Sequence, residues 1–321
     1  MRYFLVCYLI LFTAYAIGDV EKPEFNVNKG SGSYEIQLNS IDPNGNIEIH
    51  YYMPSGFSED TSVIIVIPGA GRNANDYRDS WVQSAEKYNL LVLSPSYPEE
   101  NYDFAAYHLG GVVNELNLKN PTIERLNGRI SKHRMNDEDI EFSFAKNKSD
   151  WMFDDFDKIF SSLRSIIGSK QISYDLFGHS AGGQILHRYA IFKQSSKANR
   201  IVAANSGFYT LPDVSVRYPF GTGGTPVSQS DINKSFTSKL VVLLGESDNK
   251  SEKRGTMLHT PKADTQGLGR FERGKYCYSQ SQELANSAKT PFNWQLKLVK
   301  GVGHDYRKME VAAAELLYGK K

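Results

Sequence analysis

The stretch GHSAGG, residues 178–183, is the clearest candidate for chemistry in the sequence, because a serine stands between glycines there. It follows an apolar run that favours a strand and precedes a pattern typical of a helix. Glycine weakens both elements, so a cluster of glycines at their junction needs a reason. A sharp strand-to-helix turn supplies one, because it strains the Ser180 backbone and exposes the hydroxyl as a nucleophile. The alternative is that Ser180 only caps the helix.

A serine hydroxyl is a poor nucleophile unless a base takes its proton. His304 is the best candidate for that base, because it lies in GVGHDY, just past the last predicted strand. The two glycines before it leave the chain free to approach the edge of a sheet. His259, in a loop after an earlier predicted strand, remains the rival. His179 occupies the variable position of the serine motif and is expected to pack or to line the pocket.

The base needs a carboxylate that orients its ring and stabilises its charged form. The stretch GESD offers Glu246 and Asp248 at the end of the strand predicted over 238–248. We expect Asp248, which is shorter and lies further onto the exposed edge, and Glu246 remains the alternative. The chain order Ser180, Asp248, His304 is the order produced when each member follows a later strand of one sheet.

A tetrahedral intermediate also needs backbone N–H donors for its oxyanion. Ala181 is predicted to open a helix, where the first N–H groups have no partner within the helix. The second donor is expected in IPGAGRN, after an apolar run, with Ala70 as our choice and Gly71 as the alternative. An ordinary strand-to-helix turn predicts the same glycines. This chemistry requires no metal and no other cofactor.

The elements that must position these residues alternate along the chain. SYEIQLNS and NIEIHYYMP alternate in period two around DPNGN and predict an N-terminal antiparallel hairpin. Strand and helix patterns then follow one another, which predicts an α/β fold with a mostly parallel central sheet and helices on both faces. The carboxyl ends of the parallel strands then share one edge. The expected strands are 62–71, 90–98, 171–178, 200–210, 238–248 and 293–306, and the expected helices are 73–89, 151–168, 180–193, 273–288 and 308–319.

A polar stretch from about Glu99 to Asp150 is long for a connection, and long loops in compact domains tend to be functional or disordered. Together with the loops 210–235 and 249–275, it is expected to shape the pocket. Aromatic residues near these segments either line a groove for an acyl chain or a polymer, or form the core beneath the loops, which is the more frequent outcome. They are Tyr97, Tyr102, Phe104, Tyr107, Trp151, Phe208 and Tyr209.

Composition excludes several classes of partner. The chain has 321 residues, of which 40% are hydrophobic and 23% charged, as in an ordinary soluble globular protein. Its formal net charge is +1, and removal of residues 1–18 would make it neutral, so nothing indicates nucleic acid or a strongly charged partner. After that removal Cys277 is the single cysteine, which allows neither an internal disulfide nor a zinc site.

The first 18 residues, MRYFLVCYLILFTAYAIG, follow the order of a secretory signal: Arg2, then an apolar stretch, then small residues. The apolar stretch is short for a membrane span, which needs about 20 residues. We therefore expect a signal peptide over 1–18 and a secreted or periplasmic protein. An uncleaved N-terminal anchor remains the alternative. No other segment is expected to span a membrane.

Residues from about 34 to 319 resemble an α/β-hydrolase, on the motifs GHSAGG, PGAG, GESD and GVGH. Within that superfamily, HSAGGQILHRYAIF, ANSGFYTLPD and QGLGRFERG are similar to the secreted esterase and polyhydroxyalkanoate-depolymerase-like group. Two features depart from it: Pro68 stands where the oxyanion turn often begins with His, and the disulfide of many secreted depolymerases is missing. The resemblance implies Ser180 as nucleophile, His304 as base, Asp248 as acid, and Ala70 and Ala181 as oxyanion donors.

We therefore expect a secreted serine hydrolase that cleaves small-molecule or polymeric carboxylic esters through an acyl-enzyme. It would form a single domain over 19–321 with an insertion at about 99–150. A serine peptidase on the same fold is an alternative, because the same triad hydrolyses amides. Against it, the sequence shows no propeller or other gating domain. A non-catalytic binding protein of this fold is a third possibility, although such proteins usually lose a triad member.

Overall fold

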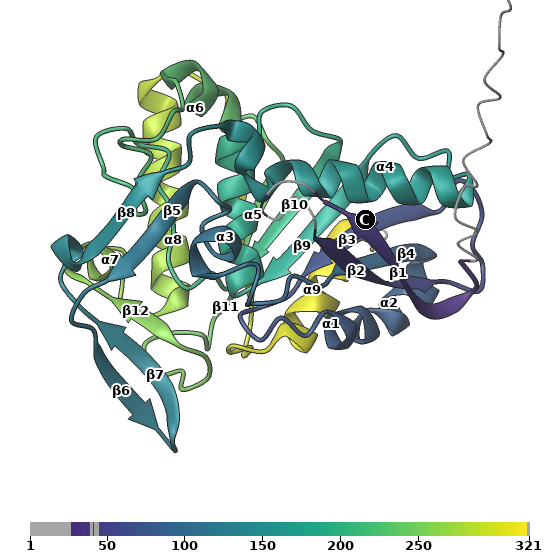
Figure 1. Ribbon diagram of the computed structural model, residues 1–321, viewed down its shortest axis with the longest axis horizontal. Helices are drawn as coiled ribbons and strands as arrows, with labels where there is room; N and C mark the ends of the chain where they lie inside the picture. The colour runs from purple at the N-terminus through teal and green to yellow at the C-terminus, as the bar shows by residue number, and fades with distance from the viewer. Residues whose placement is uncertain (1–26, 39–40, 42–44, 320–321) are drawn as a thin grey trace, which may run out of the picture.

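The computed structural model describes residues 27–38, 41 and 45–319, and a large sheet runs through its middle (Figure 1). Within the described residues this sheet has eight strands, in the order β1-β2-β4-β3-β9-β10-β11-β13. The strands are β1 (Gly30–Gln37), β2 (Asn46–Met53), β3 (Ser62–Ile67), β4 (Leu90–Pro95), β9 (Tyr174–His179), β10 (Ala198–Ala204), β11 (Leu240–Gly245) and β13 (Gln295–Val299).

The sheet is antiparallel at its N-terminal edge and parallel elsewhere. β1 pairs with β2, and β2 with β4, in antiparallel fashion. From β4 to β13 every neighbouring pair is parallel. The sequence patterns explain the difference, because β2 alternates between buried and less buried positions, whereas β4, β9 and β11 are buried along their whole length. The expected α/β-hydrolase fold, with its mostly parallel sheet and N-terminal antiparallel hairpin, is confirmed.

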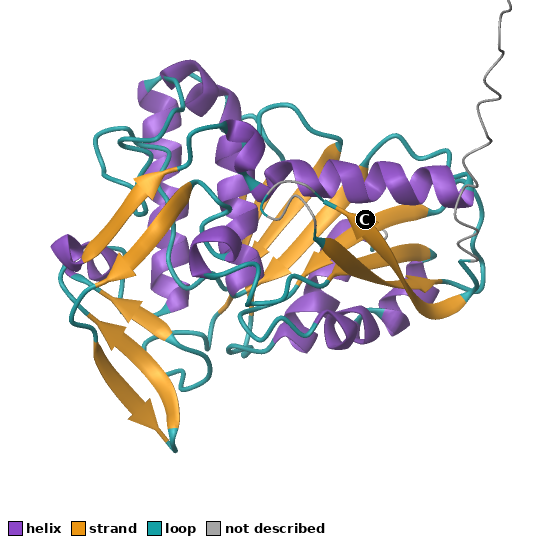
Figure 2. Cartoon of the chain, in the orientation of Figure 1, coloured by secondary structure: helices purple, strands orange, loops and turns teal. Residues whose placement is uncertain are grey.

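Helices cover both faces of the sheet (Figure 2). Successive residues of a strand point to opposite faces, so Ile65 of β3 enters one hydrophobic core and Ile64 enters the other. The first core packs against α4 (Asp155–Ile167), α5 (Ala181–Phe192) and α8 (Arg270–Ser287), and α6 (Gln229–Ser235) joins the same side. The second core packs against α1 (Ala74–Ser80), α2 (Val82–Tyr88) and α9 (Tyr306–Tyr318).

The single helix expected over 73–89 is wrong in one respect, because the chain breaks there into α1 and α2. The break falls at Trp81, whose N–H donates to the Arg78 carbonyl oxygen three residues back at 3.2 Å, a tighter turn than that of a regular α-helix. Its side chain is fully buried, and its indole meets the Phe177 ring edge-on with centroids 5.4 Å apart. Anchoring the indole on the sheet takes precedence over a continuous helix.

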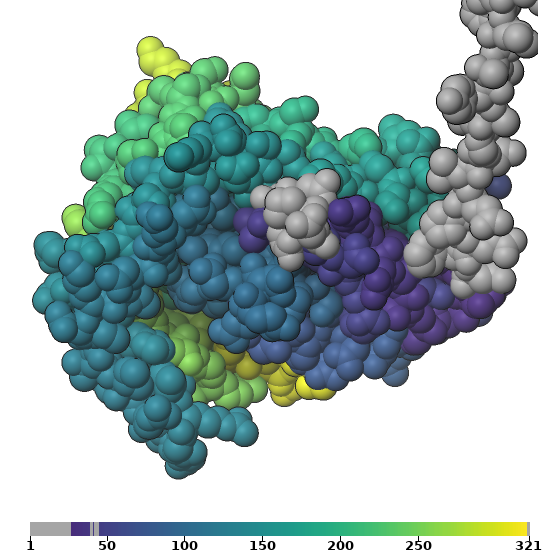
Figure 3. Space-filling model, viewed as in Figure 1, coloured from purple at the N-terminus to yellow at the C-terminus, as the bar shows by residue number. Residues whose placement is uncertain are grey.

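The polar stretch at about 99–150 contains regular structure. It holds α3 (Phe104–Tyr107), β5 (Val113–Leu118), β6 (Thr122–Leu126), β7 (Arg129–Arg134) and β8 (Ile140–Phe144). β5 pairs with β8, and β7 pairs both with β6 and with β12 (Met257–His259), which is followed by α7 (Pro261–Thr265). We call the segments 99–150 and 249–265 the cap. In Figure 3 atoms in the colours of the first segment form the lower left of the visible face.

The expected signal peptide, residues 1–18, lies outside the described residues. The division of the chain into that peptide and a single domain over 19–321 stays a prediction. None of the helices in the described ranges combines the length and the apolar character that a membrane-spanning helix requires.

Candidate active site

Ser180 occupies a sharp turn between β9 and α5. Its backbone has φ 59° and ψ −114°, a conformation that non-glycine residues rarely adopt. Glycines permit the turn: a Cβ on Gly178 would lie 2.3 Å from the Gly182 carbonyl oxygen, and one on Gly182 would lie 2.1 Å from the Ile67 carbonyl oxygen. The start of α5 can therefore lie this close to β9 and to β3 only because Gly178 and Gly182 carry no side chain.

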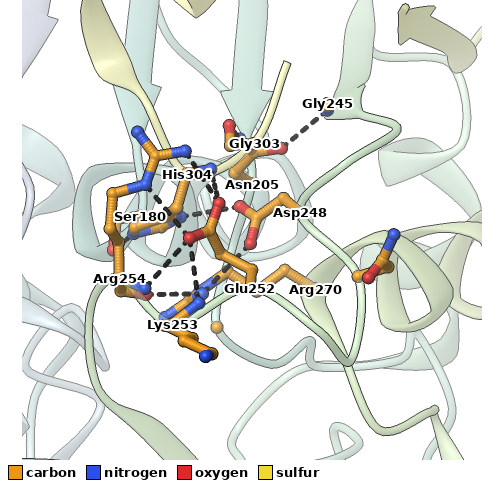
Figure 4. Close-up of polar contacts among 12 residues, drawn as sticks. Ser180, Asn205, Gly245, Asp248, Glu252, Lys253, Arg254, Arg270, Gly303 and His304 are labelled. Atoms are coloured by element: carbon orange, nitrogen blue, oxygen red, sulfur yellow. Dashed lines mark hydrogen bonds and ion pairs between the residues drawn. The ribbon is translucent and has the colours of Figure 1, made fainter. Parts of the chain in front are cut away.

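The three side chains predicted as a triad meet at the carboxyl edge of the sheet (Figure 4). His304 Nε2 lies 3.1 Å from Ser180 Oγ, and His304 Nδ1 lies 2.7 Å from Asp248 Oδ2. Asp248 is fully buried, and the His304 side chain is 9% exposed. Both distances are hydrogen bonds, so a proton can pass from the hydroxyl to the ring while the carboxylate orients the ring.

The other acid and histidines considered in the sequence do not take part in this chain of hydrogen bonds. Asp248, rather than Glu246, carries the oxygen that meets the imidazole. His259 lies on β12, and its Nδ1 contacts Asp264 Oδ1 at 2.7 Å. His179 is buried beside the base, with its ring centroid 4.5 Å from that of His304.

Burial sets the electrostatics of the pair. Burial lowers the pKa of His304 well below 6.5, and the nearby Arg270 lowers it further, so the imidazole is neutral at neutral pH and able to accept a proton. Burial raises the pKa of the Asp248 carboxyl, and the positive charge of Arg270 opposes that effect. Arg270 Nη1 donates to Asp248 Oδ1 at 3.1 Å, which gives the buried carboxylate a cation partner.

The two expected oxyanion donors lie beside the nucleophile. Ala181 follows Ser180 as the first residue of α5, and Ala70 lines the same cavity as Ser180. Within the part of the chain that is described, neither N–H group has a hydrogen-bond acceptor. Both are therefore available to an anionic oxygen. Gly71, the alternative to Ala70, also lines the cavity.

Two tyrosines that the sequence did not assign support the oxyanion turn. The Tyr107 hydroxyl of α3 donates to the Pro68 carbonyl oxygen at 2.7 Å. The Tyr77 hydroxyl of α1 interacts with the backbone of Gly69 and lies 3.4 Å from His179 Nδ1. These contacts hold the turn from both sides, in a chain that lacks the histidine often found at Pro68. Nothing in the spacing of the two tyrosines distinguishes them from ordinary core residues.

Asn205 is a further residue that the sequence did not single out. Its Nδ2 donates to the Gly303 carbonyl oxygen at 3.2 Å, and its Oδ1 accepts from the Gly245 N–H at 2.9 Å. It thus joins the loop that carries Asp248 to the loop that carries His304 (Figure 4). The available signal was its position, because it directly follows the carboxyl end of β10.

A cavity of about 580 Å³ opens onto Ser180 and His304. Its inner wall comes from the sheet edge, and its outer wall comes from the cap. Of the aromatic residues considered above, Phe104 and Phe208 line the cavity, and the others are buried in the core. The larger apolar side chains on its wall are Phe104, Leu109, Leu116, Leu118, Ile140, Phe208, Pro219 and Leu258. Among the described residues that line it, Glu99 alone is an Asp, Glu, Lys or Arg.

No group of three or more His, Cys, Asp or Glu side chains in the described ranges is arranged to hold a metal ion. Cys277 is a free, buried thiol in α8. Burial raises its pKa to about 12, so it stays protonated and unreactive at neutral pH.

Comparison with known proteins gives matches among solved structures, whereas no family model and no curated protein matches the chain. The chain is similar to poly(aspartic acid) hydrolase-1 from Sphingomonas sp. KT-1, with TM-score 0.76 and 29% identity, covering 91% of this chain and 100% of that chain. It is also similar to a poly(3-hydroxybutyrate) depolymerase from Bordetella parapertussis, with TM-score 0.76 and 25% identity, covering 91% and 90%.

A fluorophosphonate-binding serine hydrolase from Staphylococcus aureus shares the fold, with TM-score 0.51 and 12% identity, covering 90% of this chain and 97% of that chain. The fold, together with these neighbours, defines the chain as an α/β-hydrolase-fold protein. The esterase and depolymerase-like group recognised in the sequence fits them. These similar structures support a hydrolase activity, but they are named for different polymers and do not identify the bond that this chain cleaves.

Proposed function

We propose that the protein is a secreted serine hydrolase that cleaves carboxylic esters through an acyl-enzyme. The observation that carries the proposal is the continuous chain of hydrogen bonds from Ser180 Oγ through His304 to Asp248. Secretion rests on the signal pattern of residues 1–18 alone.

The proposed reaction has two halves that use the same groups. Ser180 Oγ attacks the ester carbonyl while His304 Nε2 takes its proton, and the N–H groups of Ala70 and Ala181 donate to the oxyanion. The intermediate collapses when His304 gives the proton to the departing alcohol, which leaves an acyl-serine. Water then attacks the acyl carbonyl while His304 takes one of its protons, and the second intermediate collapses as His304 gives that proton to Ser180 Oγ, which releases the carboxylic acid and restores the serine. Asp248 stabilises the imidazolium in both halves.

The cavity favours an uncharged, apolar ester as substrate. The larger side chains on its wall are mostly aliphatic and aromatic. Among the described lining residues, Glu99 is the one carboxylate, and there is no lysine or arginine. An anionic chain would meet like charge there, without a lysine or arginine on the described wall to pair with it. Hydrolysis of an amide polymer remains the second candidate, because one similar structure is named for poly(aspartic acid).

The test compares wild type with Ser180→Ala on p-nitrophenyl butyrate, poly(aspartic acid) and a peptide p-nitroanilide. We expect ester hydrolysis by the wild type, and a loss of several orders of magnitude in Ser180→Ala. A fluorophosphonate probe should label the wild type but not this variant. Ser281→Ala, which alters a buried serine in α8 away from the site, is the control and should keep both properties. Full activity in Ser180→Ala would refute the proposal. Faster hydrolysis of poly(aspartic acid) or of the peptide p-nitroanilide than of the ester would show that the enzyme cleaves amides rather than esters.

A further inference from the structure

Arg270, the first residue of α8, is buried against the proposed triad. Its side chain is 2% exposed, and Nη1 donates to Asp248 Oδ1 at 3.1 Å. The other carboxylate oxygen, Oδ2, meets His304 Nδ1 at 2.7 Å. Each oxygen of the buried carboxylate therefore has its own charged or N–H partner, which fixes the plane of the carboxylate as well as its position.

The same guanidinium holds a loop of the cap against the histidine. Nη1 also donates to the Arg254 carbonyl oxygen at 3.3 Å, and Nη2 donates to the Thr256 carbonyl oxygen at 3.2 Å. Gly255, between those two residues, has φ +70°, and a Cβ there would lie 3.0 Å from His304 Cδ2. The backbone at Gly255 therefore lies directly on the imidazole edge, and Arg270 determines where that backbone sits.

A second contact from the same loop reaches the histidine backbone. Glu252 Oε2 accepts from the His304 N–H at 2.8 Å, while Arg254 pairs with the Glu252 carboxylate at 2.8 Å (Figure 4). The hydrogen bonds from Arg254 and from the His304 backbone hold the pKa of Glu252 far below its usual range, so it is ionised throughout the working pH range. Among the described residues, the charged or titratable groups that face His304 are Asp248, Arg270, Glu252, Arg254 and His179.

These contacts give Arg270 a consequence for the proton transfer. A buried carboxylate without a cation would become protonated or would leave its position, and a neutral acid would no longer stabilise an imidazolium. The cation also opposes protonation of His304 in the free enzyme, because a second positive charge on the nearby imidazole would be repelled by it. Arg270 thus keeps Asp248 charged and His304 neutral, which is the state needed for attack.

We propose that Arg270 is a positioning residue of the active site: it fixes the triad carboxylate and the cap loop around Gly255 in one arrangement against His304. The inference rests on the proposed function, because it concerns the same triad. Arg270 acts only through Asp248 and the loop and does not contact the reacting atoms.

The test is the pH profile of kcat/KM for p-nitrophenyl butyrate in Arg270→Gln and Arg270→Lys. At low pH, kcat/KM falls as His304 becomes protonated, and we call this part of the profile the acid limb. Loss of the cation raises the pKa of His304, so the midpoint of the acid limb of Arg270→Gln should move up by about one pH unit. Its kcat should fall at least about tenfold at all pH values, because the carboxylate loses its fixed geometry. Arg270→Lys keeps the positive charge but lacks the planar guanidinium, whose N–H groups bind the carboxylate and the loop together. Its acid limb should therefore stay near that of the wild type while kcat remains low.

Arg273→Gln is the matched control, because Arg273 lies one turn further along α8 and is equally buried. It binds Asp264 and the Gly207 and Gly267 carbonyl oxygens, and has no hydrogen bond with Asp248. We expect Arg273→Gln to lower the melting temperature while leaving the acid limb in place. An acid limb at the wild-type pH in Arg270→Gln, with a Tm loss like that of Arg273→Gln, would overturn the inference.

Two readouts keep the inference separate from the proposed function. The rate of fluorophosphonate labelling of Ser180 as a function of pH reports the triad without a turnover substrate. A wild type that is neither labelled nor active on esters contradicts the proposed function, whereas a labelled wild type whose acid limb is insensitive to Arg270 contradicts only the inference. If Arg270→Gln does not fold, Arg270→Lys decides: wild-type kcat in that variant refutes the need for the guanidinium fork.

Discussion

Glu310 provides a prediction about stability that follows from a single buried carboxyl group. It lies on α9, is 1% exposed, and accepts a hydrogen bond at 3.0 Å from the Ser84 hydroxyl of α2, with Ser80 as a second hydroxyl partner. Among the described residues, no cation is one of the groups that shift its pKa. Burial therefore raises the pKa of Glu310 from 4.5 to about 8, and the serine hydrogen bonds only partly oppose that effect.

The direction of the pH dependence follows from comparing the two states. Below pH 4.5 the carboxyl is protonated in both the folded and the unfolded chain, so it costs nothing. As pH rises from 4.5 to about 8, the unfolded chain releases the proton while the folded protein keeps it, so stability is lost. Each pH unit in this interval costs ~1.4 kcal/mol, which amounts to about 3 kcal/mol at pH 7 and about 5 kcal/mol above pH 8.

The assay is thermal unfolding of wild type, Glu310→Gln and Glu315→Gln at pH 5 and pH 8.5. Glutamine keeps the shape and cannot ionise, so Glu310→Gln should raise Tm at pH 8.5 by on the order of 10 °C and leave it nearly unchanged at pH 5. Glu315 is the control on the same helix: its side chain is 62% exposed and its pKa is lowered by hydrogen bonds from Tyr88 and Lys87. Parallel Tm curves for wild type and Glu310→Gln would refute the reasoning.

Two further predictions concern the site. Asp248→Asn should lower kcat by about 10⁴-fold on an ester substrate, because the amide favours the wrong tautomer of the histidine, whereas Glu246→Gln should change kcat less than threefold; the reverse ranking would assign the acid to Glu246. Gly182→Ala should lower kcat and Tm together, since its Cβ would lie 2.1 Å from the Ile67 carbonyl oxygen and push the start of α5 away from β3; unchanged kinetics would show that the turn tolerates a side chain.

The fold was predictable because its strands have a strong pattern. The continuous apolar run of β3 and the period-two alternation of β2 report burial on both faces and on one face of a sheet. Element ends were less predictable: the last strand ends at Val299, well before His304, because its apolar pattern continues into the loop. The break at Trp81 depends on a contact with Phe177, which local periodicity does not contain.

The site was predictable to the extent that its residues follow strands. Ser180 directly follows a strand and has glycines two residues away on each side, and His304 follows a glycine in the loop after the last strand, which is visible in a sequence. Arg270 and Glu252 lie on segments that reach the site only through the folding of the cap. Their contacts are set by tertiary packing over many residues, and an arginine at a helix start is otherwise an ordinary surface feature. The cap strands were missed because their polar, partly exposed residues weaken the strand pattern.

We expect the cap, rather than the proposed triad, to decide substrate choice. The proposed triad lies at the sheet edge, its histidine side chain is 9% exposed, and the cavity beneath the cap opens onto Ser180. One row of side chains crosses the small cap sheet from Leu258 to His133 and on to Ile123, because these residues are direct cross-strand partners. The first two line the cavity, and Ile123 is 44% exposed at its outer end. Under the proposed ester hydrolysis, we expect a longer substrate chain to follow this row outward, past the apolar Leu258 and Ile123 and the imidazole of His133, because the row continues the cavity wall.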